Sequence, residues 1–224
     1  MIKLGLIGNG FVGGAARQLE CQQNIVCVYD LDPDKCMPKG TSLETVAACD
    51  LIFVAVPTPS RKDGTCHIDI VVSVVTALKK ANAAANIIIR STVPPGTSKS
   101  LGTNFMPEFL TEANANKDFR DNPLWILGAL DKKNSSILQQ LLTNAKTAGK
   151  IASDSLTTML PTEAEMVKYV RNCFLSVKVA FFNELYDVCQ QHGCDYAAVR
   201  LAATADTRIG SGHTKVPGPD GHRG

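Results

Sequence analysis

The feature that most constrains the fold is a glycine-rich turn close to the start of the chain. Glycines at positions 8, 10 and 13 form a G-x-G-x-x-G pattern between an apolar segment, 2–7, and a helix-like segment, 11–22. Gly8 permits a tight turn after a strand, Gly10 lets the backbone approach a pyrophosphate, and Gly13 allows close helix–strand packing. The helix would offer its free N–H groups and a partial positive charge to phosphate. The pattern therefore predicts a dinucleotide site.

Asp30 supports this interpretation, because it ends the next apolar segment, 25–29. An acidic residue at that place binds the 2′- and 3′-hydroxyls of the adenosine ribose, which favours NAD over NADP. Taken alone, Asp30 is equally well read as a turn residue of the segment 30–33. Its position downstream of the glycine pattern decides for the cofactor role.

The first half of the chain alternates strand-like and helix-like segments. Four uniformly apolar segments read as strands buried on both faces, which is typical of a parallel sheet. The fold class expected is therefore α/β, a Rossmann-like doubly wound sheet. Strands are expected at 2–7, 25–29, 51–56, 86–90 and 125–128, with a short last one at 151–152. Helices are expected at 11–22, 42–49 with Ser42 as N-cap, 68–84 and 132–147.

A different pattern begins at Thr162. Thr162 and Glu165 have the spacing of a capping box, and apolar residues then recur at helical intervals up to Gly193, a suitable C′ residue. About thirty helical residues span about 45 Å, too long for a helix lying on a sheet face, so we expect an interdomain or intersubunit helix. The apolar positions are Met166, Val170, Cys173, Val177, Phe181, Leu185 and Val188. The expected domains are 1–158, which binds the cofactor, and 159–224, with a loop from 210.

Composition excludes several classes of protein. A net charge of +2 argues against a nucleic-acid binder, and no apolar run is long enough to cross a bilayer. The segment 1–7 reads as a buried strand and not as a signal peptide. The eight cysteines form no C-x-x-C pair, and the four histidines are scattered, so we expect free thiols, a cytoplasmic location and no metal site.

Four further segments resemble one enzyme family, the UDP-glucose/GDP-mannose dehydrogenases, and they occur in that family's order over nearly the whole chain. They are LIFVAVPTP at 51–59, RSTVPPGT at 90–97, MPEFLTE at 106–112 and EAEMVKYVRN at 163–172. The resemblance implies an NAD-dependent oxidation of a nucleotide sugar, with UDP-glucose favoured, to the uronate by two successive hydride transfers. It also implies a homodimer built through the long helix.

The resemblance assigns roles to individual residues. It places Thr58 and Glu112 near NAD and has Thr92 position both the cofactor and a catalytic water. Further cofactor contacts are expected from Phe11, Val12 and Lys35. The resemblance assigns acid/base catalysis to Glu108 and substrate contacts to the adjacent Phe109 and Leu110. Lys168 and Asn172 are expected to contact the reacting end of the sugar.

Elementary chemistry agrees with the Lys168–Asn172 assignment. Residues four apart share one helical face, where an ammonium and an amide can address one developing oxyanion. Without other evidence, a lysine and an asparagine at this spacing would more often lie on a solvent-exposed helix face. The other motifs favour the functional interpretation instead.

One part of the family pattern is missing. The family's nucleophilic cysteine resembles Gly-Gly-x-Cys-x-Pro-Lys-Asp and follows a loop rich in glycine and proline; the chain has the loop, 208–224, without the motif. Cys173 is adjacent to Asn172, but it points about 100° away and falls in the apolar stripe. We therefore expect NAD binding with little or no complete four-electron oxidation by these 224 residues.

Two alternatives stay open at this point. A 3-hydroxyacid dehydrogenase related to 6-phosphogluconate dehydrogenase would share the glycine pattern and a Lys-x-x-x-Asn helix, although the segment 107–112 speaks against it. A catalytically silent NAD-binding, dimerising module would also fit. Dependence of NAD reduction on a nucleotide sugar separates the three.

Overall fold

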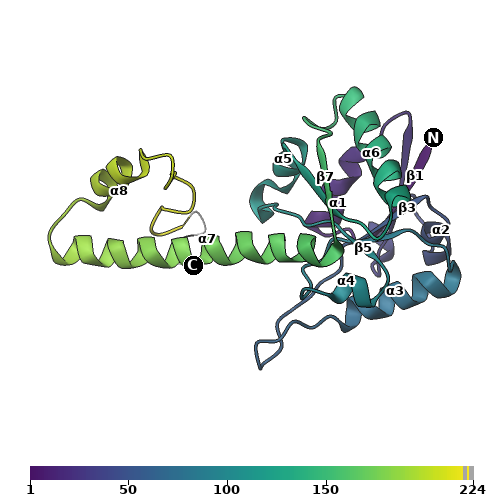
Figure 1. The fold of residues 1–224 in the computed structure, drawn as a ribbon, viewed down its shortest axis with the longest axis horizontal. Helices are drawn as coiled ribbons and strands as arrows, with labels where there is room; N and C mark the ends of the chain where they lie inside the picture. Colours follow the sequence, from purple (N-terminus) through teal and green to yellow (C-terminus); the bar gives the residue numbers. More distant parts are fainter. Residues whose placement is uncertain (219–220, 222–224) are drawn as a thin grey trace. The chain divides into compact units, whose positions relative to one another are not determined.

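The computed structural model describes residues 1–218 and 221 (Figure 1). The chain divides into two compact units, Met1–Lys168 and Tyr169–Gly224, and each is considered by itself. Whether the family's own domain boundary falls at 158, ahead of the long helix, stays a prediction.

Within the described residues the first unit contains a seven-stranded sheet of order β2-β1-β3-β4-β5-β6-β7. Every neighbouring pair is parallel except β5–β6. The strands are β1 (Ile2–Ile7), β2 (Asn24–Tyr29), β3 (Leu51–Val54), β4 (Ile87–Ile89), β5 (Asn104–Phe105), β6 (Trp125–Gly128) and β7 (Leu156–Met159). The doubly wound α/β fold expected from the sequence is confirmed.

Helices cover both faces of this sheet (Figure 1). They are α1 (Phe11–Ala16), α2 (Leu43–Ala47), α3 (Asp69–Ala81), α4 (Thr97–Ser100), α5 (Ala115–Arg120) and α6 (Lys132–Thr147), with 3-10 turns at Arg17–Leu19, Pro33–Lys35 and Glu112–Asn114. On β3, Leu51 and Phe53 join the core beneath α1, α5 and α6, whereas Ile52 and Val54 join the core beneath α2 and α3. A strand buried on both faces needs apolar residues at every position, which explains the uninterrupted runs in the sequence.

The ends of several elements differ from the expectation. The first helix ends at Ala16, followed by a 3-10 turn to Leu19, because the buried Asn24 amide donates to the Leu19 carbonyl and turns the chain into β2. The last strand is Leu156–Met159 and not 151–152, so that prediction is wrong. Its sequence, Leu-Thr-Thr-Met, is mixed because it forms the partly exposed edge of the sheet.

The capping box predicted for the long helix is also wrong. Helix α7 (Pro161–Gln191) begins one residue earlier, and the Leu160 N–H donates to the Glu163 carboxylate at 2.7 Å. The Glu165 carboxylate accepts from the Gly96 N–H at 2.5 Å and the Ser98 N–H at 2.7 Å. The acid expected to cap its own helix therefore holds a turn almost seventy residues earlier in the chain.

The second unit consists of most of α7, helix α8 (Tyr196–Thr204) and an irregular return segment. Phe182, Cys189 and Tyr196 form its small core, and the Tyr196 hydroxyl donates to the Thr214 carbonyl at 2.6 Å. The loop expected from 210 agrees with the described part, in which no helix or strand follows Thr204. Positions 219–220 and 222–224 of that loop lie outside the described residues.

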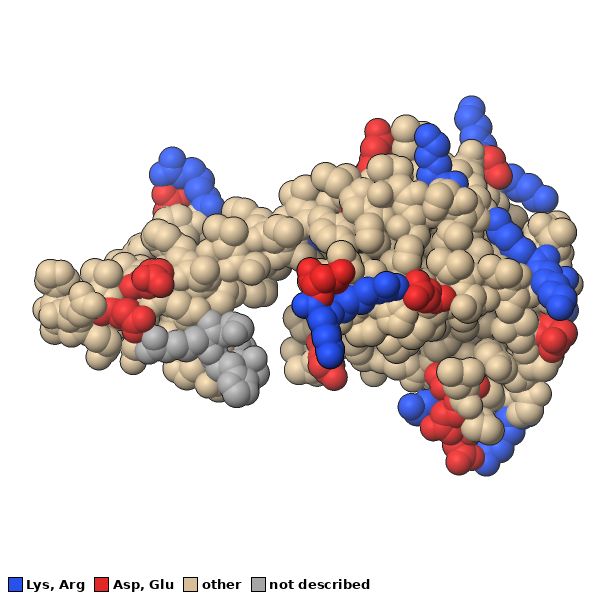
Figure 2. All heavy atoms as spheres, turned by 90° about the horizontal axis from the view of Figure 1, so that it is seen from below, with Lys and Arg blue, Asp and Glu red and all other residues tan. Residues whose placement is uncertain are grey.

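The surface gives further bounds. None of the helices in the described part is long and apolar enough to cross a membrane, and the same residues hold no cluster of three or more metal-binding side chains. Lysine and arginine side chains are mixed with aspartate and glutamate on the face in Figure 2.

Candidate functional site

The glycine turn has the geometry that a dinucleotide requires. Gly8 has φ +91°, and a Cβ there would lie 2.3 Å from the Ala55 carbonyl oxygen. A Cβ on Gly13 would lie 1.9 Å from the Gly8 carbonyl oxygen, whereas a Cβ on Gly10 would meet nothing within 4 Å. The fold itself demands two of the glycines, and the third borders open space beside the N-terminus of α1. That space suits a pyrophosphate.

Asp30 ties the end of β2 to this turn. Its carboxylate accepts from the Asn9 N–H at 2.7 Å and from the Asp32 N–H at 3.0 Å. The Asn9 side chain donates in turn to the Lys35 carbonyl at 2.7 Å. Each carboxylate oxygen keeps a free lone pair, so the group can still accept from ribose hydroxyls.

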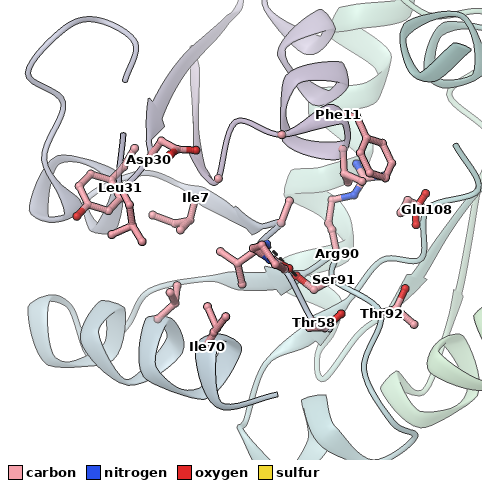
Figure 3. Close-up of a pocket in the computed structure, with 18 of the residues that line it drawn as sticks. Ile7, Phe11, Asp30, Leu31, Thr58, Ile70, Arg90, Ser91, Thr92 and Glu108 are labelled. Atoms are coloured by element: carbon pink, nitrogen blue, oxygen red, sulfur yellow. Dashed lines mark hydrogen bonds between the residues drawn. The ribbon is translucent and has the colours of Figure 1, made fainter. Parts of the chain in front are cut away.

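A cleft of about 620 Å³ runs from Asp30 along the carboxyl ends of the parallel strands (Figure 3). Ligands bind at this edge of open α/β sheets, and the volume suits a dinucleotide. Asp30 and Leu31 line one end, and the other end is lined by Phe11, Thr58, Arg90, Ser91, Thr92 and Glu108 (Figure 3). Gly8, Gly10, Val12 and Lys35 also line the cleft. The residues present therefore fit a bound NAD.

Ser91 fixes the far end of the cleft, and the sequence analysis gave it no role. Its hydroxyl donates to the Val56 carbonyl at 2.7 Å and accepts from the Val56 N–H at 2.9 Å. These bonds join the turns after β3 and β4, which carry Thr58 and Thr92. Its place between Arg90 and Thr92 in a recognised segment was the available signal.

A buried ion pair lies beside this end of the cleft. The Lys168 ammonium donates to the Glu108 carboxylate and to the Glu108 carbonyl, both at 2.7 Å, and the side chains are 8% and 10% exposed. The second Glu108 carboxylate oxygen accepts from the Leu110 N–H at 2.9 Å. Lys168 also lies 5.6 Å from the centre of the Phe109 ring. Residues sixty positions apart thus form one buried ion pair beside the cleft.

Arg90 is a second charged residue that the sequence analysis left without a role. It is 2% exposed and stacks between Phe53 and Phe119, whose ring centres lie 5.3 and 5.4 Å from its guanidinium carbon. Its Nε and Nη1 atoms have no hydrogen-bond partner within the described residues. Burial lowers the pKa of Arg90 to about 10, against the attraction of Glu108, so it stays charged at neutral pH.

Comparison with known proteins identifies the family. The chain matches the NAD binding domain of the UDP-glucose/GDP-mannose dehydrogenase family over residues 35–146 and the central domain of the same family over residues 162–222. The chain belongs to this family. Its cofactor is accordingly NAD, and the matched domain is the one that carries the cleft.

Individual relatives agree with this assignment. A UDP-glucose 6-dehydrogenase of Rickettsia prowazekii is 34% identical over 173 residues, 72% of this chain and 39% of that protein. The UDP-glucose 6-dehydrogenase YwqF of Bacillus subtilis is 29% identical over 222 residues, 88% of this chain and 49% of that protein. A UDP-glucose dehydrogenase structure from Pyrobaculum islandicum superposes with a TM-score of 0.83 at 27% identity, covering 96% of this chain and 59% of that one. The chain spans half or less of the length of these curated relatives.

The structure brings most of the family residues together, with two exceptions. Glu112 is exposed and lines a separate hollow with Asn9 and Arg17, and Phe11 lines both this hollow and the cleft. Asn172 is exposed in the second unit, one helical turn after Lys168 along α7. The roles of all these residues stay predictions.

Proposed function

We propose that this chain supplies the NAD site and part of the sugar site of a nucleotide-sugar 6-dehydrogenase. The supporting observation is one continuous cleft that runs from Asp30, at the glycine turn, to Glu108, which is paired with the buried Lys168. The proposed reaction oxidises the primary alcohol of a nucleotide hexose to a carboxylate in two hydride transfers.

Each end of the cleft has a distinct task. Asp30 accepts from the adenosine ribose, and the N-terminal N–H groups of α1 bind the pyrophosphate. Bound NAD supplies the hydride acceptor. At the other end, Thr58 and Thr92 orient the nicotinamide, and Thr92 holds a water.

The Glu108–Lys168 pair handles the proton and the oxygen charge. Lys168 has three donors, two of which are engaged by Glu108, so one remains for the reacting oxygen. Glu108 takes up the hydroxyl proton, and Asn172 adds an amide donor. An oxyanion stabilised in a buried, preorganised site is the largest single contribution to this kind of catalysis.

UDP-glucose is the proposed substrate, since similar curated proteins from Rickettsia prowazekii and Bacillus subtilis are UDP-glucose 6-dehydrogenases, although a similar protein from Pseudomonas syringae is a GDP-mannose 6-dehydrogenase. Family membership favours this function over the 3-hydroxyacid dehydrogenase alternative. A module that binds NAD without turnover stays a second candidate, and the next experiment separates the two.

The deciding experiment combines NAD calorimetry with NADH production at 340 nm. It compares this chain with a version extended through the family's cysteine motif and C-terminal domain, each offered UDP-glucose, GDP-mannose and a 3-hydroxyacid. We expect NAD to bind both proteins and only the extended one to reduce NAD with UDP-glucose. Failure of both proteins to bind NAD would overturn the proposal, and turnover of another substrate would correct the specificity. In the extended protein, Glu108→Gln should lower kcat far more than it changes NAD affinity.

We also propose a homodimer formed through α7. Six of its large apolar residues are exposed in the isolated chain, and their spacing puts them along one helical face. They are Met166, Val170, Phe174, Val177, Phe181 and Val188. Light scattering should give twice the chain mass, and Phe174→Glu should give the monomer; a wild-type monomer at all concentrations would contradict the dimer. The cytoplasmic location stays a prediction.

A further inference from the structure

The Arg90 guanidinium is a buried charge for which no acid among the described residues supplies a hydrogen bond. Two of its nitrogen atoms lack a partner within the described residues, and its neighbours are the faces of Phe53 and Phe119. A buried unpaired charge is costly, and aromatic rings return only part of that cost. A buried charged side chain that lines a cleft is a candidate for a functional role.

The charges around Arg90 do not cancel. Glu108 attracts Arg90 electrostatically, but both Glu108 carboxylate oxygens already accept, one from the Lys168 ammonium and one from the Leu110 N–H. Arg90, Lys168 and Glu108 are each at least nine-tenths buried. These three side chains together carry one net positive charge, and the nearby Asp118, which lines a hollow with Arg90 and Glu108, is partly exposed and accepts from Thr111.

The direction of the cleft decides which part of the cofactor meets that charge. Asp30 and Leu31 line one end, and Arg90 lines the other together with Thr92 and Glu108 (Figure 3). Lys35 belongs to the Asp30 end, because Asn9 bonds both the Asp30 carboxylate and the Lys35 carbonyl. With the adenosine ribose at Asp30 and the pyrophosphate at the α1 N-terminus, the nicotinamide lies at the Arg90 end. This placement rests on the proposed function.

We propose that Arg90 sets the preference of the site for the reduced cofactor. The nicotinamide ring carries a positive charge in NAD⁺ and none in NADH, so the uncompensated guanidinium repels the oxidised ring and tolerates the reduced one. The same repulsion favours hydride transfer onto bound NAD⁺. A unit charge about 10 Å away at an effective dielectric of about 20 changes the affinity ratio roughly tenfold.

The test measures NAD⁺ and NADH affinities by calorimetry on the full chain, and the readout is the ratio of their dissociation constants. Wild type should bind NADH about tenfold more tightly. Arg90→Met should bring the ratio close to one, and Arg90→Lys, which keeps the charge, should preserve it. Lys35→Met is the matched control at the adenosine end: it should weaken both ligands alike and leave the ratio unchanged.

Melting temperature separates this role from a structural one. Methionine fills the space between the two rings without unpaired donors, so Arg90→Met should melt no lower than wild type. A large loss of stability with an unchanged ratio would assign Arg90 to packing.

Either of two results would overturn the inference about Arg90 while leaving the proposed function standing. In the first, wild type binds NAD⁺ as tightly as NADH; in the second, Arg90→Met keeps the wild-type ratio of dissociation constants. If neither form of the cofactor binds the wild type, the proposed function fails as well. The failures are therefore distinguishable.

Discussion

The two compact units bury their apolar residues in very different ways. The first places large side chains on both faces of its sheet, where Phe53, Phe105 and Phe119 are at most 1% exposed. The second has three buried apolar side chains among its described residues, Phe182, Cys189 and Tyr196, whereas Phe174 and Phe181 on α7 are 64% and 62% exposed. The first unit therefore carries its own stability, whereas the second presents an apolar face suited to a partner.

The largest expected effect tests the core of the first unit. Phe119→Ala removes a fully buried ring that packs edge-on against Trp125 at 4.9 Å, and should cost about 3–5 kcal/mol of unfolding free energy. Phe174→Ala, at low concentration, should change it by less than about 0.5 kcal/mol. Urea unfolding measures both. Equal losses would break the contrast between the units.

A second prediction separates glycines required by the fold from the one that borders the ligand space. Gly13→Ala forces a Cβ against the Gly8 carbonyl and should cost roughly 1–3 kcal/mol or more, with loss of NAD binding. Gly10→Ala should keep the melting temperature and still weaken NAD, because its Cβ enters the cleft. Calorimetry and thermal melts on the two proteins decide. If Gly10→Ala bound NAD as tightly as wild type, the proposed position of the pyrophosphate beside Gly10 would be wrong.

A third prediction concerns the small core of the second unit. Burial raises the pKa of Tyr196 above its ordinary value, so the folded chain keeps a proton that the unfolded chain releases just above pH 10. The contribution is complete below pH 10 and is lost as pH rises through the folded-state pKa. Alkaline titration of stability should show this loss, and Tyr196→Phe should remove it while costing about 1 kcal/mol for the bond to Thr214. An unchanged alkaline profile in the variant would contradict it.

The smallest effect is one of reactivity within the first unit. The Cys27 and Cys49 sulfurs lie 3.4 Å apart, and the hydrogen bond from Cys49 lowers the pKa of Cys27 to about 7. Alkylation of Cys27 should reach half its maximal rate near pH 7, and Cys49→Ala should shift that midpoint upward. Mass-spectrometric peptide mapping over pH 6–9 follows it. If Cys49→Ala left the pH midpoint of Cys27 alkylation unchanged, the hydrogen bond from Cys49 would not be the cause of the lowered pKa.

Local signals explain what could be predicted from the sequence. The glycine turn, the four apolar parallel strands and the Ser42 cap depend on residues close together in the chain, and the structure confirms them. Strand β7 was misplaced because an edge strand with two threonines lacks an apolar run.

Signals that depend on distant partners were lost. Glu165 has the spacing of a cap, but its partners are Gly96 and Ser98. Arg90 begins the family-like segment 90–97, and only the fold shows that it is buried and that no acid among the described residues bonds it. The ion pair of Glu108 with Lys168 joins two segments whose motifs were visible but whose contact was not.

Glu165 has a consequence for how such enzymes can be recombined. Its carboxylate fastens the turn after Thr92 to the first turns of α7, three residues before Lys168, and all of these belong to the first unit. Lys168, to which we assign a role in proton handling, therefore belongs with the cofactor-binding unit and not with the downstream unit. A chimera joined after Lys168 would exchange the downstream residues, including the proposed sugar ligand Asn172, for those of another family member while leaving the Glu108–Lys168 ion pair intact.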